Sequence, residues 1–108
     1  MFNINTLPRV TVPVPLFVQV DGERQDHSFS ATFELIDPEA EGIDVTVGTG
    51  DRELLDRVVV GLGDIADNKG DVLRFSDELK RRVLARMDAR AALLRAFYGE
   101  VPKLIRGN

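Results

Sequence analysis

The chain has 108 residues, with 14 basic and 18 acidic side chains, one histidine, no cysteine and a formal net charge of −4. A chain of this length is expected to form one domain with a modest core. The lack of cysteine excludes disulfides, thiolate metal sites and cysteine nucleophiles, and it favours a reducing compartment such as a cytosol. A mildly acidic balance argues against a nucleic-acid-binding protein, which needs a concentrated basic face.

The first 36 residues are predicted to form an antiparallel β-hairpin or small sheet. Every even position from Val10 to Val20 is apolar, which is typical of a strand with one buried face. Pro13 and Pro15 lie on the other parity, so their missing donors fall along one side and predict an edge strand. Asp21-Gly22 supplies the turn, and a second alternating strand follows from Phe29 to Leu35.

Residues 37–50 are predicted to be a loop, since Asp37-Pro38 stops the strand and three glycines follow, with room for a short extended piece over 43–47. A helix is then expected from Asp51 to Val60, capped by Thr49 or Asp51. Its apolar side consists of Leu54, Leu55, Val58 and Val59.

Two further helices complete a helical part that spans 51–106. Ser76 is predicted to cap the first of them, and Asp88 the second, which should end around Gly99 or Pro102. The apolar stripes of these helices are Leu79, Val83, Leu84 and Met87 in the first, and Leu93, Leu94, Ala96 and Phe97 in the second. The predicted fold is therefore α+β, a single domain with a hairpin followed by about three packed helices.

The run "VGLGDIA" from Val60 to Ala66 has the spacing of a dinucleotide-binding turn. Such a turn needs a strand before its glycines and a helix that begins within them, because the helix N-terminus holds the pyrophosphate. Here a helix is expected before the glycines and a turn after them. We therefore interpret Gly61 or Gly63 as a left-handed helix stop and expect no cofactor.

Other candidate sites also favour structural interpretations. Asp67 to Gly70 fits a type I turn, whereas an EF-hand alignment would place Ile65 and Ser76 where carboxylates are required. The single histidine, His27, is interpreted as a solvated residue near a turn rather than a catalytic base. The basic side chains from Lys80 to Arg90 are interpreted as a solvated helix face. We expect no enzyme activity, no membrane span and no secretory signal.

Three stretches together resemble the tail assembly chaperones of long-tailed, siphovirus-like bacteriophages. "FSATFELI" at 29–36 is similar to the strand that closes the family's N-terminal hairpin, and "ALLRAFYGEVPKLIRGN" at 92–108 is similar to its closing helix and terminal Gly-Asn. Between them, 58–84 resembles the family's glycine, acidic turn and Phe-Ser pattern. The matching residues are Gly61, Asp64, Ile65, Asp67, Gly70, Phe75 and Ser76. Leu62 departs from the pattern, because relatives often have tryptophan there.

The resemblance implies a non-catalytic protein of a phage or prophage that binds the tape-measure protein and keeps it soluble during virion morphogenesis. It also implies self-association, action in the bacterial host cytoplasm and absence from the mature virion. A groove between helices would suit an apolar client helix. The candidate partner-binding residues are Leu62, Val58, Phe97 and Tyr98.

Two other classes of function stay open at this point. One is a protein–protein adaptor or another small phage structural protein, such as a head–tail joining protein. The other is a nucleic-acid-binding regulator that uses the basic run. Leu62 itself is expected to be either a core residue or part of a client groove.

Overall fold

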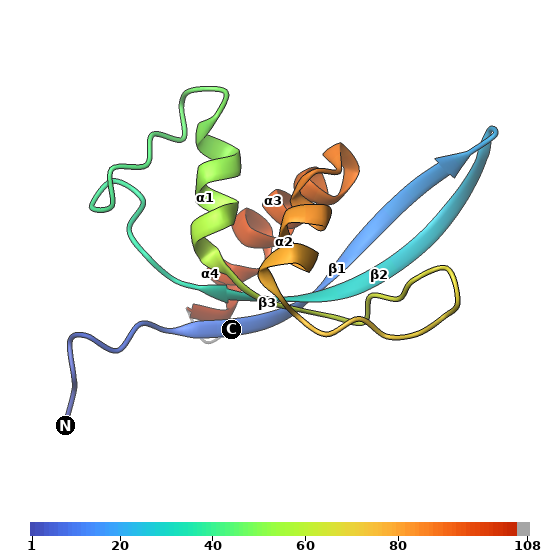
Figure 1. Cartoon of the computed structure of the whole chain (residues 1–108). Helices are drawn as coiled ribbons and strands as arrows, with labels where there is room; N and C mark the ends of the chain where they lie inside the picture. Colours follow the sequence, from blue (N-terminus) through green and yellow to red (C-terminus); the bar gives the residue numbers. More distant parts are fainter. Residues whose placement is uncertain (106–108) are drawn as a thin grey trace.

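The computed structural model of the protein describes residues 1–105 and has the predicted α+β fold. Strands β1 (Arg9–Val20), β2 (Glu23–Glu34) and β3 (Val59–Gly63) form an antiparallel sheet in the order β1-β2-β3. Figure 1 shows α1 (Gly50–Val58), α2 (Asp77–Leu84) and α3 (Met87–Gly99) on one side of this sheet. A short final helix, α4, spans Val101–Ile105. The end of the predicted helical part, at residue 106, and the terminal Gly-Asn lie outside the described residues.

The hairpin follows the period of two in the sequence. Val12 and Val14 are buried beneath the helices, whereas Pro13 and Pro15 are exposed. Asp21 and Gly22 both have positive φ angles, 52° and 82°, as a two-residue type I′ turn requires. β1 lies at the edge of the sheet, as its prolines predict.

The predicted helix over 51–60 is too long, because α1 ends at Val58 and the chain continues directly as β3. β-branched valines fit a pleated strand better than a helix, and the strand buries Leu62 opposite Ala31 of β2. The interpretation of Gly61 or Gly63 as a left-handed helix stop is therefore wrong. Both glycines lie within β3, and Asp64, with φ 60°, is the residue in the left-handed region.

The two glycines of β3 instead allow a close approach to β2. A Cβ atom at Gly61 would lie 3.1 Å from the Thr32 side chain, and one at Gly63 would lie 2.6 Å from Ser30 Oγ. The chain then turns at Asp67 to Gly70, where the Gly70 amide donates to the Asp67 carbonyl at 3.0 Å. A β-turn is therefore present at the four residues where the sequence predicts one. Residues 37–49 contain turns and no strand, so the short extended piece over 43–47 is absent.

The helix starts are partly as predicted. Ser76 caps α2, since its Oγ accepts a hydrogen bond from the Leu79 amide at 3.0 Å. α3 begins earlier than expected, with Arg86 rather than Asp88 at the N-cap. Asp88 lies in the first turn, where its carboxylate binds the Arg86 guanidinium at 2.7 Å. Met87, assigned to the stripe of the preceding helix, starts α3 and is exposed.

One hydrophobic core lies between the sheet and the helices. Phe97 of α3 packs edge to face against the buried Phe33 of β2, with 5.3 Å between ring centroids. Small side chains at Ala92 and Ala96 are buried on α3, which packs against β1. The largest fully buried side chains are Phe33, Leu54, Leu55, Leu84, Leu93, Val14, Val58 and Val59.

Candidate functional site

Helix α3 carries two apolar faces, and only one of them lies in the core. The core face consists of Ala89, Ala92, Leu93 and Ala96. A second stripe, at helical spacings of three and four residues, consists of Met87, Ala91, Leu94 and Tyr98. Met87 and Tyr98 at its ends are 79% and 54% exposed. The stripe is therefore an apolar helix face that the rest of the domain leaves partly uncovered.

This second stripe forms one side of a groove of about 520 Å³ between α3 and the start of α1. The opposite wall is the segment 48–53, which includes the N-terminal turn of α1. Met87, Ala91 and Leu94 supply the apolar lining. Methionine suits a surface that adapts to different partners, because its side chain is flexible and polarizable. We call this site the α1–α3 groove.

Charged side chains at the rim of the groove are balanced in sign. Asp51 and Glu53 of α1 are acidic, whereas Arg52 and Arg90 are basic. Arg90 donates a hydrogen bond to the Leu84 carbonyl at 2.6 Å, which holds it against the end of α2. The rim therefore has no net charge, and its lining favours an apolar ligand over a strongly ionic one.

Tyr98 continues the stripe toward the C-terminal end of α3. Its ring packs edge to face against Phe97, with 5.3 Å between the centroids. Partial burial, and secondarily the nearby Asp51 carboxylate, raise the pKa of the Tyr98 hydroxyl, so it stays neutral near pH 7. Tyr98 thus offers an aromatic face and an uncharged hydroxyl at the end of the stripe.

The four candidate partner-binding residues from the sequence fall into two groups. Val58 is fully buried and Leu62 is only 8% exposed, so both belong to the core. Their prediction as partner-binding surface residues is therefore wrong. Phe97 is half-buried against the core, and Tyr98 is exposed beside the groove. Sequence reasoning missed Met87 and Ala91 as groove residues, although their spacing with Leu94 and Tyr98 was visible.

The residues that carry the sequence resemblance lie in β3 and in the segment that joins it to α2. Asp67 closes the turn, since its carboxylate accepts from the amides of Lys69 and Asp71 at 2.8 and 3.1 Å. Ile65 accepts from the Leu73 amide at 2.8 Å and packs partly against the core. Gly70, with φ 83°, ends the turn. None of these contacts is directed at the α1–α3 groove.

A dinucleotide site does not fit the run from Val60 to Ala66. Both glycines lie within β3, contrary to expectation, but no helix begins at or directly after them, and α2 starts only at Asp77. The helix N-terminus that would hold a pyrophosphate is therefore missing at this position. Within residues 1–105, no group of three or more His, Asp or Glu side chains is arranged to hold a metal ion.

His27 lies within β2 rather than near a turn, and it is exposed. Its Nε2 forms a hydrogen bond with Gln25 Oε1 at 3.1 Å. Several cations of the basic run make contacts inside the chain, including Lys80 with the Asp56 carbonyl and Arg86 with Asp88. These contacts fix part of the run against neighbouring helices.

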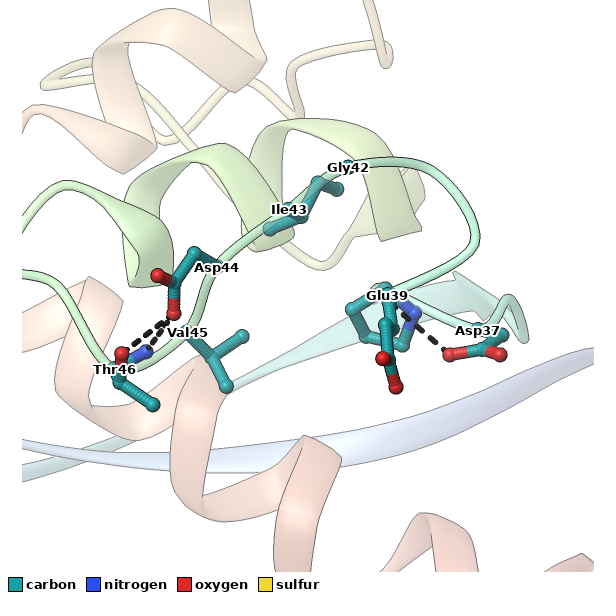
Figure 2. Close-up of a pocket in the computed structure, with 8 residues that line it drawn as sticks. Asp37, Glu39, Gly42, Ile43, Asp44, Val45 and Thr46 are labelled. Atoms are coloured by element: carbon teal, nitrogen blue, oxygen red, sulfur yellow. Dashed lines mark hydrogen bonds between the residues drawn. The ribbon is translucent and has the colours of Figure 1, made fainter.

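A slightly larger hollow, of about 590 Å³, is formed by the loop from Asp37 to Thr46 (Figure 2). Its carboxylates bind their own loop: Asp37 accepts from the Glu39 amide at 3.1 Å, and Asp44 accepts from the Thr46 amide at 2.9 Å. The Thr46 hydroxyl and amide lower the pKa of Asp44. Figure 2 shows these two carboxylates apart, each turned to a residue of the same loop. The hollow is thus part of one loop's own folding, and the α1–α3 groove is the better candidate site.

The helices in the described part of the chain are too short or too polar to cross a membrane. Comparisons with family models, curated proteins and solved structures gave no match to this chain.

Proposed function

We propose that the protein is a non-catalytic tail assembly chaperone of a long-tailed bacteriophage, which binds the tape-measure protein and keeps it soluble before the tail is complete. It acts in the host cytoplasm, self-associates and leaves the assembly before the virion matures. The sequence resemblance across 29–36, 58–84 and 92–108 supports this proposal. The observation from the fold that carries it is the second apolar stripe of α3.

The α1–α3 groove suits an amphipathic helix. A client helix would lay its apolar face on Met87, Ala91 and Leu94, in the same way that helix-binding proteins receive apolar anchors at i, i+3 or i+4 and i+7. Covering this face removes apolar surface of both partners from water. The balanced rim would admit client helices that differ in charge, which a chaperone for a long helical protein needs.

The test compares two exposed apolar residues, one in the groove and one outside it. Met87 in the groove is 79% exposed, and Val72 near the turn between β3 and α2 is 74% exposed. Met87→Asp places a charge among apolar side chains at the interface, so we expect binding of a helical tape-measure fragment to weaken by about tenfold or more, which is ~1.4 kcal/mol. Val72→Asp is the matched control and should bind like the wild type.

The measurements are isothermal titration calorimetry with the fragment and its co-purification with each variant. Circular dichroism verifies that both variants keep the fold. Equal affinity of the Met87→Asp variant and the wild type would place the client elsewhere on the molecule. A wild-type protein that neither binds nor solubilises the fragment would refute the chaperone function.

A further inference from the structure

The segment before β1, Met1–Pro8, is the most apolar exposed part of the described chain. Phe2 and Ile4 are 84% and 78% exposed, and Leu7 is exposed as well. No residue of this segment has an ionisable side chain. The segment therefore combines large apolar side chains with no charged side chain, and the α-ammonium of Met1 is its one ionic group.

Two of the hydrogen bonds that the segment makes lie within the segment itself. The Thr6 amide donates to the Asn3 carbonyl, and the Asn5 amide donates to Asn3 Oδ1, both at 3.0 Å. At the end of the segment, the carbonyl of Pro8 accepts from the amide of Leu35, the residue that follows β2, at 2.8 Å. Figure 1 shows the segment leaving β1 on the side away from α1, α2 and α3.

The segment and the groove match in chemistry. The groove has an apolar lining from Met87, Ala91 and Leu94 and a rim whose charges cancel. A segment whose side chains are all uncharged, with Phe2 and Ile4 among them, fits such a surface better than a strongly ionic one. The groove volume, about 520 Å³, lies within the range of small ligand pockets and can receive a few large side chains.

From this match we infer that the segment Met1–Leu7 of one copy docks into the α1–α3 groove of a second copy and occupies it until a client displaces it. The inference rests on the proposed function for the role of the client. The occupant is the second copy, because the segment runs away from α1 and α3 of its own domain, the two helices that line the groove. Self-association and client binding then compete for one surface, so the free chaperone keeps its apolar groove covered.

The first experiment measures association by sedimentation velocity over a wide concentration range. We expect the wild type to associate reversibly and the Phe2→Asp/Ile4→Asp variant to remain monomeric at every concentration. Asn3→Asp/Asn5→Asp is the matched control, because it adds the same charge to the same segment at polar positions, and it should associate like the wild type. Thermal unfolding should be the same for all three proteins, since the segment lies outside the core.

The second experiment locates the contact. The chain has no cysteine, so Ile4→Cys and Met87→Cys can be introduced into separate chains and mixed under oxidising conditions. A disulfide between the two chains supports the inference. A chain that carries both cysteines and closes the disulfide only within itself would overturn the choice of a second copy. A monomeric wild type, or a Phe2→Asp/Ile4→Asp variant that associates normally, would overturn the inference entirely.

Titration with the tape-measure fragment separates this inference from the proposed function. If both hold, the fragment dissociates the wild-type assembly and binds the Phe2→Asp/Ile4→Asp variant more tightly than the wild type, because no segment competes. Equal affinity for both proteins would contradict the competition and leave the client proposal standing. A fragment that binds neither protein would refute the chaperone function, whereas association that still depends on Phe2 and Ile4 would preserve the docking of the segment.

Discussion

Gly50 is the position where one added methyl group should do most damage. It is buried at the first position of α1, and a Cβ atom there would lie 1.9 Å from the Asp44 carbonyl oxygen and 2.9 Å from the Val45 Cα. Both are backbone atoms of the loop that precedes the helix, so no side-chain rotation can relieve the overlap. Gly50→Ala must therefore move the loop or the start of α1.

The magnitude follows from two opposing effects. Overpacking of a well-packed site costs about 1–3 kcal/mol. Replacing glycine by alanine also lowers the entropy of the unfolded chain, which stabilises by about 0.4–1 kcal/mol. We expect Gly50→Ala to lose roughly 1–2 kcal/mol of unfolding free energy, which lowers Tm by about 4 °C or more in a domain of this size.

Gly48, two positions earlier, provides the matched control. A Cβ atom there would meet nothing within 4 Å, and its φ angle is not positive. Gly48→Ala should be neutral or stabilise by up to about 1 kcal/mol. Thermal unfolding by circular dichroism and urea titration measure both variants. If Gly50→Ala is as stable as the wild type, or if Gly48→Ala is equally destabilised, the packing of the loop against α1 is not as described.

Three further predictions follow from individual contacts. Leu62→Ala should lose about 2–5 kcal/mol in urea unfolding because Leu62 is buried in β3; a loss below about 1 kcal/mol would contradict its place in the core. Ser76→Ala should lose about 1 kcal/mol by the same assay, since the Leu79 amide loses its cap, while an unchanged stability would show that the cap is dispensable. Hydrogen bonds from Arg9, and next from Arg57, lower the pKa of Glu34 in the folded protein below its ordinary value of 4.5. The ionised Glu34 carboxylate therefore stabilises the fold at pH values above 4.5, and this stabilisation is lost as the pH falls through the lowered pKa. Unfolding followed from neutral to acid pH should therefore show a smaller loss of stability in Glu34→Gln than in the wild type, and identical pH profiles would refute this.

The hairpin could be predicted from the sequence because its determinants are local. The alternation from Val10 to Val20 fixes which face is buried, and Asp21-Gly22 fixes the turn and therefore the register. Pro13 and Pro15 even place β1 at the edge of the sheet. Ser76 was predicted as a cap for a similar reason, since a cap contacts a backbone amide only three residues away.

β3 was missed because its pairing is not local. The valines from Val58 to Val60 continue the apolar side of α1, so the helical pattern extends two residues past the true helix end. The partner that pairs with this stretch as a strand is β2, which is separated from β3 along the chain by a loop and by α1. The valine run beside two glycines was the available signal, since it combines high strand propensity with a break in the helix.

The lining of the α1–α3 groove could not be predicted from the sequence either, because it depends on packing and not on a local pattern. The sequence contains both stripes of α3, and helical spacing alone assigns Leu93 and Leu94 to one broad apolar side. The packed structure separates them: Leu93 is fully buried, whereas Leu94 lies at the groove with Met87 and Ala91. Which stripe of a helix meets the sheet depends on the position of α1, and no local rule gives that position.

Leu62 has a clear place in the packing. It faces the core opposite Ala31, so a small side chain on β2 lies across from it. A small neighbour on the adjacent strand leaves room for a larger side chain at position 62 without a change of register. The structure therefore favours the core alternative for Leu62. The apolar side chains of α3 that the core leaves exposed are instead Met87, Ala91 and Tyr98, and Leu94 between them packs only partly against the core.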